Sequence, residues 1–278
     1  MTEPVFESVY EIDTAHPDYT RWQRAIDQAR LRGEAVCDAI ALHCDLHGAV
    51  VLDAGCGVGG SSAALNARGA DVIAVDRNPA RLDAVRHTLP DIDVEEADLE
   101  ALPYPDDSFD AIVLQDVIEH VTAPSEVLAE LARVLAPKGV LYMSTPNRQS
   151  VANVVSDPHF GLPLVSLYSR PRLREVLKRK RPADAWRDDL AQLLSFDELT
   201  GLLHASGLQP TLHNRFMARR LFEQPRALVW SDMHLRAVDV LRRSGLHRFV
   251  TDLVSDDAGF YNTWIAPSWY LVCRKDGA

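Results

Sequence analysis

Residues 50–60 read VVLDAGCGVGG, and this stretch decides the fold. A short apolar run, Val50–Leu52, ends in the carboxylate of Asp53, and four glycines follow before the chain enters Ser61–Ala67, which has the composition of a helix. A strand, a glycine turn and a helix in this order make a loop whose backbone can approach a ligand closely, because a Cβ at the glycine positions would block it.

A second apolar run, Asp71–Val75, ends in Asp76 at the spacing where an open α/β sheet places an acid to hold the two hydroxyls of a ribose. The pair of strand ends therefore predicts a site for a nucleoside-containing cofactor. Dinucleotide sites read Gly-x-Gly-x-x-Gly and direct a helix N-terminus at a pyrophosphate. This chain instead reads Asp-x-Gly-x-Gly-x-Gly-Gly, and the acidic strand end suits an ammonium and a sulfonium better than two phosphates.

The stretch resembles the first motif of the class I S-adenosylmethionine-dependent methyltransferases, and further motifs follow in the family's order. Asp76 matches the ribose-binding acid, and Ala97–Leu99 matches the position that holds the adenine. Residues 102–113 match the turn into strand four, and residues 117–121 and 135–141 match the helix start and the turn into strand five. The small-molecule O-methyltransferases of ubiquinone biosynthesis are the most similar in character.

The resemblance implies S-adenosylmethionine as the cofactor. It assigns the cofactor contacts to the glycine turn, the ribose acid, the adenine pair and the end of strand four. The residues concerned are Asp53, Gly55, Cys56, Gly57, Gly59, Asp76, Arg77, Asp98, Leu99, Gln115 and Asp116.

Composition and charge narrow the class of protein. The chain has 278 residues, 47% hydrophobic and 25% charged, which is typical of a globular protein. Its net charge of −11 is unevenly distributed, because residues 1–147 hold 26 acids and 10 bases while the remainder holds 14 acids and 19 bases. An acidic protein binds nucleic acid poorly, since phosphate contacts need Lys and Arg, so no nucleic-acid partner is predicted.

Cysteine usage and the first residues predict the compartment. The four cysteines stand singly, with no Cys-x-x-Cys pair and no His/Cys cluster at zinc spacing, which predicts free thiols in a reducing cytoplasm and no metal. The chain starts without a basic segment followed by an apolar core, and no apolar run is long enough to cross a bilayer. A cytoplasmic protein without a membrane span is expected, while the sequence leaves the oligomeric state open.

The chain divides where its pattern changes. From residue 48 strand and helix alternate five times, which predicts a parallel sheet buried on both faces, and the alternation stops after Asn147. Ser195 and Glu198 form a capping box for a later helix. The predicted segments are an N-terminal helical cap (1–47), a cofactor-binding α/β core (48–147), an insertion or lid over the substrate (148–194), a core helix and strand six (195–216), a second helical insertion (217–263) and a final core strand (264–278).

Strand six is expected over Leu208–Phe216, and the final strand over Trp269–Arg274 is expected to be antiparallel, as in the family. The fold class that follows is α/β. It comprises a Rossmann-like, doubly wound, mostly parallel seven-stranded sheet with an N-terminal helical cap and two helical insertions.

Three side chains are candidates for catalysis. Methyl transfer from a sulfonium is an in-line displacement, and a base is needed only where the acceptor is protonated at working pH. Glu119 and His120 are predicted in the first turn of the helix after strand four, and His159 in the turn 157–161 of the first insertion. The competing interpretation makes Glu119 and His120 a pair that fixes a helix start, and His159 a surface histidine.

A basic run stands out in the second half of the chain. Most such runs are solvated helix faces, but this one would also suit an anionic acceptor, whether a carboxylate, a phosphate or a carrier protein. Its members are Arg170, Arg172, Arg174, Lys178, Arg179, Lys180 and Arg181.

The function predicted is transfer of a methyl group from S-adenosylmethionine to a small-molecule acceptor, at the oxygen of a hydroxyl or carboxyl group. Carbon and nitrogen acceptors share this core and stay open, as does a binding module that keeps the cofactor but not catalysis. A nicotinamide-dependent dehydrogenase is disfavoured by the glycine spacing and by the absence of a Tyr-x-x-x-Lys pair.

Overall fold

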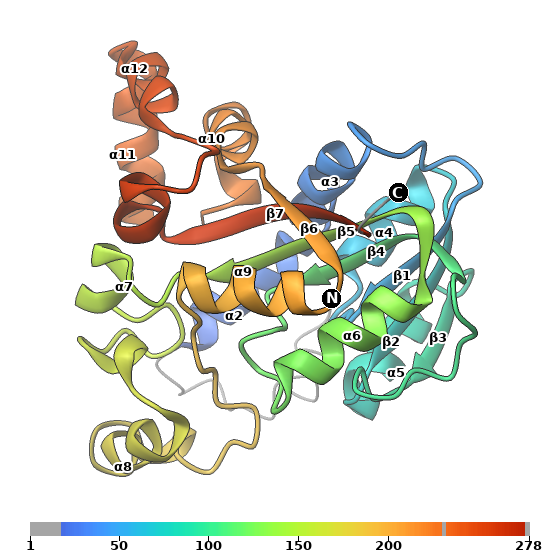
Figure 1. Ribbon diagram of the computed structural model, residues 1–278. Helices are drawn as coiled ribbons and strands as arrows, with labels where there is room; N and C mark the ends of the chain where they lie inside the picture. Colours follow the sequence, from blue (N-terminus) through green and yellow to red (C-terminus); the bar gives the residue numbers. More distant parts are fainter. Residues whose placement is uncertain (1–17, 230–231, 276–278) are drawn as a thin grey trace.

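A seven-stranded sheet forms the centre of the molecule, in a computed structural model that describes residues 18–229 and 232–275 (Figure 1). The strand order is β3-β2-β1-β4-β5-β7-β6. Strands β1 to β5 are parallel, and β7 runs antiparallel to both β5 and β6. This confirms the predicted sheet and its antiparallel last strand. The strands are β1 (Val50–Ala54), β2 (Asp71–Asp76), β3 (Asp93–Glu96), β4 (Phe109–Gln115), β5 (Leu135–Pro146), β6 (Leu208–Leu212) and β7 (Ser268–Lys275).

Helices cover both faces of the sheet, as the apolar strands require. One apolar cluster packs α6 (Pro124–Val134) and α9 (Phe196–Ala205) on one face. A second cluster packs three helices on the other face, namely α3 (Ala29–Ile40), α4 (Gly60–Ala67) and α5 (Pro79–Thr88). The capping box of Ser195 and Glu198 is present at the start of α9.

The predicted alternation is wrong between β3 and β4, where the chain forms no helix. This connection contains Pro103 and Pro105, which cannot donate the backbone hydrogen bonds of a helix interior. Arg133 of α6 donates instead to the carbonyls of Tyr104 at 2.8 Å and Leu102 at 3.2 Å, so side-chain bonds satisfy the loop.

Strand β6 is shorter than predicted, because the chain leaves the sheet at His213. The buried Asn214 accepts a hydrogen bond from the backbone N–H of Tyr270 at 2.9 Å and donates to Asn262 at 2.6 Å. Its side chain therefore ends the pairing of β6 with β7, and α10 (Asn214–Glu223) begins where a strand was expected.

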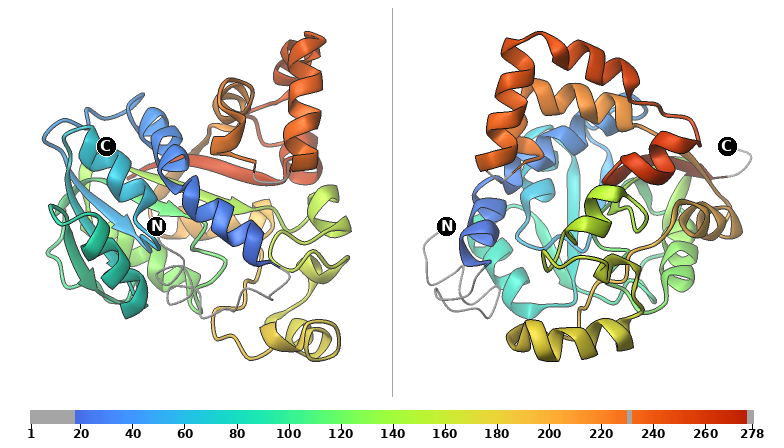
Figure 2. Two further views of the ribbon diagram at one scale, coloured as in Figure 1. Left: turned by 180° about the vertical axis from the view of Figure 1, so that it is seen from behind. Right: turned by 90° about the vertical axis from the view of Figure 1, so that its left-hand side faces the viewer.

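The two insertions lie on one side of the molecule, beyond the ends of the parallel strands (Figure 2). No helix in the described ranges combines the length and apolarity needed to cross a membrane. The first insertion contains α7 (Val151–Val155), η1 (Val165–Leu167), α8 (Arg170–Lys180) and η2 (Pro182–Asp184); the second contains α10, η3 (Pro225–Ala227), α11 (Asp232–Arg243), α12 (Leu246–Leu253) and η4 (Tyr261–Ile265).

Candidate functional site

The glycine turn after β1 forms one wall of a cavity. Gly55, Gly57 and Gly59 have φ angles of 76°, 56° and 76°, in the left-handed region that glycine enters without strain. A Cβ on Gly57 would meet no protein atom within 4 Å, whereas one on Gly55 would lie 2.6 Å from Val117. Gly57 therefore leaves room for a ligand, while Gly55 allows the turn to pack against the protein.

Asp53 closes the end of β1. It is buried, and its Oδ2 accepts a hydrogen bond from Ser62 Oγ at 2.5 Å, which ties the strand to α4. Burial raises the pKa of Asp53 to about 6, although the bond from Ser62 opposes the shift. A cationic ligand group in the cavity would stabilise the charged form of this carboxyl.

Asp76 at the end of β2 holds the glycine turn from the other side. Its Oδ2 accepts from the N–H of Gly57 at 3.0 Å, and its Oδ1 accepts from the N–H of Asn78 at 2.9 Å. Asp98 follows β3, and its Oδ1 accepts from the N–H of Glu100 at 3.0 Å. Both acids line the same cavity.

The cavity has a volume of about 670 Å³, and most of the predicted site residues line it. Two do not: Gly59, whose added Cβ would meet Val85 and Leu89 of the neighbouring helix and its end, and Glu119, which lies behind the wall. The predicted residues that line the cavity are Asp53, Gly55, Cys56, Gly57, Asp76, Arg77, Asp98, Leu99, Gln115, Asp116, His120 and His159.

The N-terminal helices form another wall of the cavity. The sequence predicted a helical cap here but not which of its residues line the site. Within the predicted cap of residues 1–47, residues 1–17 lie outside the described residues, while the chain after them forms α2 (Tyr19–Asp27) and α3, and one face of the pair lines the cavity. Its residues recur at helical spacing, which was the available signal. They are Arg21, Trp22, Ala25, Ala29 and Arg32.

Asp116 connects this cap to the sheet. Its backbone has a φ of 54°, which is uncommon for a residue other than glycine. One carboxylate oxygen pairs with the guanidinium of Arg32, and the other accepts from Ser144 Oγ at 2.8 Å. Beside it, Ser61 Oγ donates to the amide oxygen of Gln115 at 2.9 Å. The end of β4 is thus held by α3, α4 and β5 together.

Glu119 and His120 do not lie in a helix. They occupy a turn, and α6 begins only at Pro124, so the predicted placement in a first helical turn is wrong. Proline favours the first position of a helix and disfavours helical backbone in the residue before it. The start of α6 is therefore fixed downstream of His120.

His120 and His159 meet at the cavity although they are far apart in the sequence. Their rings pack edge to face with centroids 5.1 Å apart. His120 Nδ1 lies 2.7 Å from the carbonyl oxygen of Asp189, so this nitrogen donates and Nε2 carries the lone pair. Burial lowers the pKa of both imidazoles, and the nearby His120 lowers that of His159 further. The pair is therefore neutral near pH 7.

Glu119 stands directly behind these rings. It is 1% exposed, and Oε2 accepts from Thr145 Oγ1 at 2.9 Å while Oε1 has no hydrogen-bond partner. Burial and the nearby Asp116 raise the pKa of Glu119 far above its ordinary value. Glu119, His120 and His159 each place one ligand atom within 4.8 Å of the others, a grouping that sequence spacing did not predict.

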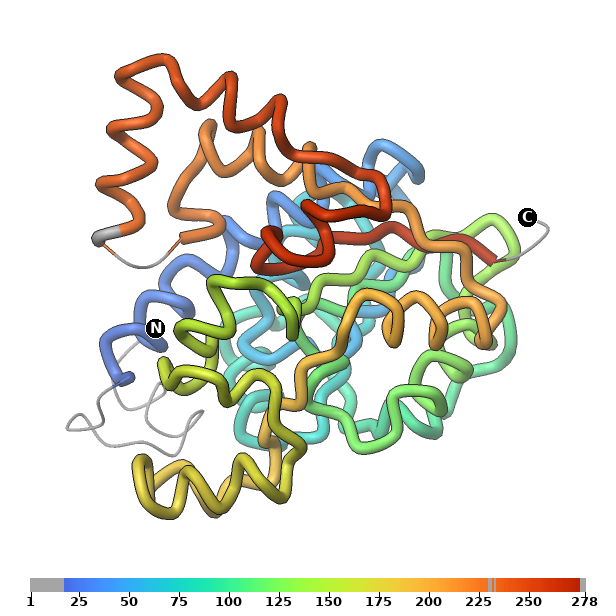
Figure 3. Tube along the Cα trace, turned by 60° about the vertical axis from the view of Figure 1, so that its left-hand side comes forward, coloured from blue at the N-terminus to red at the C-terminus, as the bar shows by residue number. Residues whose placement is uncertain are grey.

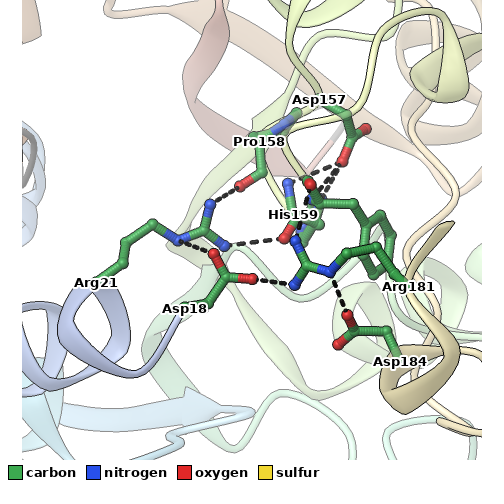
Figure 4. A network of polar contacts seen from close by, with 8 residues as sticks. Asp18, Arg21, Asp157, Pro158, His159, Arg181 and Asp184 are labelled. Atoms are coloured by element: carbon green, nitrogen blue, oxygen red, sulfur yellow. Dashed lines mark hydrogen bonds and ion pairs between the residues drawn. The ribbon is translucent and has the colours of Figure 1, made fainter. Parts of the chain in front are cut away.

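The first insertion is attached to the cap beside His159 (Figure 4). Arg21 of α2 donates to the carbonyls of Pro158 at 3.0 Å and His159 at 2.9 Å. Asp18 pairs with Arg181, which also pairs with Asp184 at 2.9 Å. Asp157 Oδ1 accepts from the N–H of His159 at 2.8 Å, so the turn that presents this histidine is held from both sides.

Four further charged residues line the cavity and were missed, namely Arg81, Glu100, Arg187 and Asp189. Arg81 lies 3.7 Å from Asp76 and 3.9 Å from Asp189, and Arg187 pairs with Asp189 at 2.8 Å. Burial alone would raise the pKa of Asp189, but the Arg187 guanidinium lowers it overall. Arg81 lies in the first turn of α5, five residues after Asp76, so its position next to the ribose acid in the sequence could have predicted that it lines the cavity. Asp189 has no comparable local signal in the sequence.

The basic run does not line the cavity. Arg170 donates to the carbonyls of Leu190, Glu119 and Val121, and so fastens α8 to the turn before α6. Arg174 donates to the carbonyl of Arg187 at 3.1 Å, and Arg172 lies over the ring of Tyr168. The run therefore has no contact with the cavity in the described structure, and its recognition of an anionic acceptor stays a prediction.

Comparison with known proteins identifies the core. Residues 52–143 match the family model of a methyltransferase domain. A "probable S-adenosylmethionine-dependent methyltransferase" of Mycolicibacterium smegmatis is 38% identical over 42% of this chain and 45% of its own length. A demethylmenaquinone methyltransferase of Renibacterium salmoninarum is 34% identical over 61% of this chain and 64% of its own. A ubiquinone biosynthesis O-methyltransferase of Xanthomonas oryzae is 36% identical over 41% and 50%.

The similarity to these relatives covers only part of each protein. The chain spans between 36% and 64% of the length of the first four curated relatives that it matches. Among solved structures, an S-adenosylmethionine-dependent methyltransferase of Mesorhizobium loti aligns over 88% of this chain and all of its own, with a TM-score of 0.56 at 19% identity. That structure supports the fold alone.

Proposed function

We propose that this chain is a class I S-adenosylmethionine-dependent methyltransferase that methylates an oxygen of a small-molecule acceptor bound in the cavity. The proposal rests on the match of residues 52–143 to the family model of a methyltransferase domain and on the relatives named for S-adenosylmethionine-dependent methyl transfer. S-adenosylmethionine is the cofactor that this domain implies. The observation that carries the acceptor side is the meeting of two neutral imidazoles, from the end of β4 and from the first insertion, at the wall of the cavity.

The cofactor end of the cavity fits the group. The open space at Gly57 admits a ligand against the backbone, and Asp76 offers carboxylate oxygens for two ribose hydroxyls. Asp98 and the Leu99 backbone are placed to hold an adenine, and Asp53 lies where a cationic methionine portion would stabilise its charge. Gln115 and Asp116 complete this end of the cavity.

The acceptor end would serve alignment and proton removal. S-adenosylmethionine supplies an electrophilic methyl group on a sulfonium. His120 Nε2 would take the proton of the acceptor hydroxyl, with Nδ1 held by the Asp189 carbonyl in the tautomer that this requires. His159 would position the acceptor from the opposite side, and Glu119 would stay behind the rings as a neutral carboxyl.

Carbon and nitrogen acceptors stay in competition. One relative is named for demethylmenaquinone and another for O-methylation in ubiquinone biosynthesis, so relatives with similar cores carry different acceptor names. An anionic acceptor would have to be recognised by the arginines that line the cavity, since the basic run lies outside it. We expect no metal requirement, because Glu119, one of the three grouped side chains that could ligate an ion, does not line the cavity.

The function is tested by incubating the chain with S-adenosylmethionine and matched acceptors of the same ring size. These are a phenol, a carboxylic acid, an aniline and a compound whose ring carbon is the nucleophile. Formation of S-adenosylhomocysteine with the phenol or acid supports the proposal. Turnover confined to the carbon or nitrogen acceptor overturns the choice of oxygen. Tight binding of S-adenosylhomocysteine without turnover of any acceptor favours the binding module, and a chelator should leave the rate unchanged.

A further inference from the structure

Exposed apolar side chains gather on the two insertions. Among the described residues, thirteen large apolar side chains are exposed, and all but Leu42 lie within residues 148–194 and 214–265. Scattered surface apolar residues are ordinary, but a concentration of this kind marks an interaction surface. The proposed methyl transfer does not explain it, because these side chains do not line the cavity.

Helix α12 carries the clearest part of this surface. Leu246, Phe249 and Leu253 recur at the spacing of one helix face and are 53%, 62% and 59% exposed. A helix that packed this face on the protein core would bury the stripe. Phe260, which precedes η4, and Trp264 within it add aromatic rings that are 74% and 43% exposed. The amphipathic pattern of α12 thus faces outward.

Side-chain bonds join these elements into one surface. Asn262 of η4 donates to the carbonyls of Ser255 at 2.7 Å and Asp257 at 2.9 Å, which fixes η4 to the segment after α12. Ser150 Oγ, at the start of α7, donates to the carbonyl of Ile265 at 3.3 Å. Figure 3 shows α11, α12 and η4 above α7, on the side where the first insertion also lies. The segments that carry these apolar residues are therefore joined by hydrogen bonds, and we call α7, α11, α12 and η4 together the platform.

Arginines gather beside α12, on a side of the helix that its apolar stripe does not occupy. A hollow of about 840 Å³ lies between α10, α11 and α12, and four arginines line it, together with Glu223, Asp239 and Asp252. Arg243 pairs with Asp239 at 2.9 Å, whereas Arg242 and Arg248 form no ion pair with any residue of the described ranges. The lining arginines are Arg219, Arg242, Arg243 and Arg248.

An apolar helix face beside arginines matches the chemistry of a lipid surface. Side chains such as Phe, Trp and Leu enter the boundary between headgroups and acyl chains, and guanidinium groups bind lipid phosphates. We propose that α11, α12 and η4 dock on the surface of a bilayer that contains anionic lipid, with the apolar face of α12 in that boundary and the arginines of the hollow at the phosphates. The proposal is independent of the proposed methyl transfer.

The test is sedimentation of the full chain with vesicles of phosphatidylcholine, alone or mixed with phosphatidylglycerol. We expect binding to the mixed vesicles that weakens as salt rises, because screening reduces attraction to the anionic surface. Leu253→Ser should weaken binding about tenfold, which equals about 1.4 kcal/mol. Leu42→Ser is the matched control, since Leu42 is 58% exposed and lies outside the platform, and it should bind like the wild type.

The contribution of the arginines of the hollow is tested in the same vesicle assay. Arg242→Glu with Arg248→Glu should weaken binding to the mixed vesicles at least about tenfold, since each cation near an anionic surface contributes about 1 kcal/mol. Arg86→Glu on α5 is the control for charge reversal elsewhere. Thermal unfolding and binding of S-adenosylhomocysteine verify that every variant is folded.

Two results would overturn the proposal. One is a vesicle assay in which Leu253→Ser and the double arginine variant bind mixed vesicles no more weakly than the wild type, whether all three bind or none does. The other is a wild-type dimer in light scattering that Leu253→Ser converts to a monomer, since the face would then be an interface between two copies.

Discussion

The cofactor-binding core and the two insertions differ in how their structure is specified. In the core, the positions that build the cavity lie at strand ends close in sequence to one another, and backbone geometry such as the φ of Gly57 decides the site. The positions of the insertions are instead fixed by hydrogen bonds from side chains to backbone carbonyls far away in the sequence, as from Arg21 to Pro158 and from Asn147 to Asn262. A local motif can therefore identify the core, whereas the insertions depend on partners that only the folded chain brings close.

The largest effect is expected at the glycine turn, where a substitution tests whether local backbone geometry decides the cofactor site of the core. Gly57→Val should abolish measurable binding of S-adenosylhomocysteine, because its side chain would enter the space left for the ligand and its backbone would be strained at a φ of 56°. Gly161→Val in the first insertion is the matched control, with a φ of 66° and equally open surroundings. It should lose stability by about 1–2 kcal/mol and keep the cofactor. Normal binding by Gly57→Val would refute the cofactor site.

Next in size is the ribose acid. Asp76→Ala should weaken S-adenosylhomocysteine binding about tenfold or more by calorimetry, since it removes a charge-assisted contact worth about 1.5–3 kcal/mol. The variant also loses the acceptor of the Gly57 N–H, which adds to the effect. Asp98→Ala should have a smaller effect, because the Leu99 backbone would remain available to the adenine. Equal effects of the two substitutions would contradict the assignment.

The histidine pair tests whether the core and the first insertion act together. His120→Ala and His159→Ala should each lower kcat and leave S-adenosylhomocysteine binding unchanged, with a loss of about 10²–10⁴ for the residue that removes the proton. Burial lowers the pKa of His120, so the wild-type rate should hold from neutral pH down through 6.5 and fall only below that lowered pKa. The loss that high pH restores marks the base, since an ionised acceptor no longer needs one. If neither variant slows turnover, alignment alone accounts for catalysis.

The smallest expected effect is at the contact that joins cap and insertion. Arg21→Ala should raise the acceptor KM only several-fold and leave kcat nearly unchanged, because the lost hydrogen bonds to the carbonyls of Pro158 and His159 hold the turn and do not contact the acceptor. Arg24→Ala is the control on the same helix, since Arg24 pairs with the exposed Asp232 outside the cavity. An equal change in both variants would show that the helix as a whole, and not this contact, is responsible.

The sequence alone determined the sheet, its glycine turn and most of the cofactor-side residues. Asp53, Gly57 and Asp76 follow buried strands at a spacing set by the strand–turn–helix geometry, so a linear pattern was enough to bring them together. The sequence also contained the signal that Glu119 and His120 precede the helix, because Pro124 favours the first position of α6.

Only the tertiary structure decided the acceptor side and the outer surface. His120 contacts His159, Arg32 pairs with Asp116, and the carbonyl of Asp189 binds His120. The partners in each contact are far apart in the sequence, and no periodic pattern of residues relates them. The basic run was read from its charge, but its arginines bind backbone carbonyls in the folded chain. The physical reason is that hydrogen bonds of local elements recur with fixed spacing, whereas contacts between distant side chains depend on the packing of the whole chain.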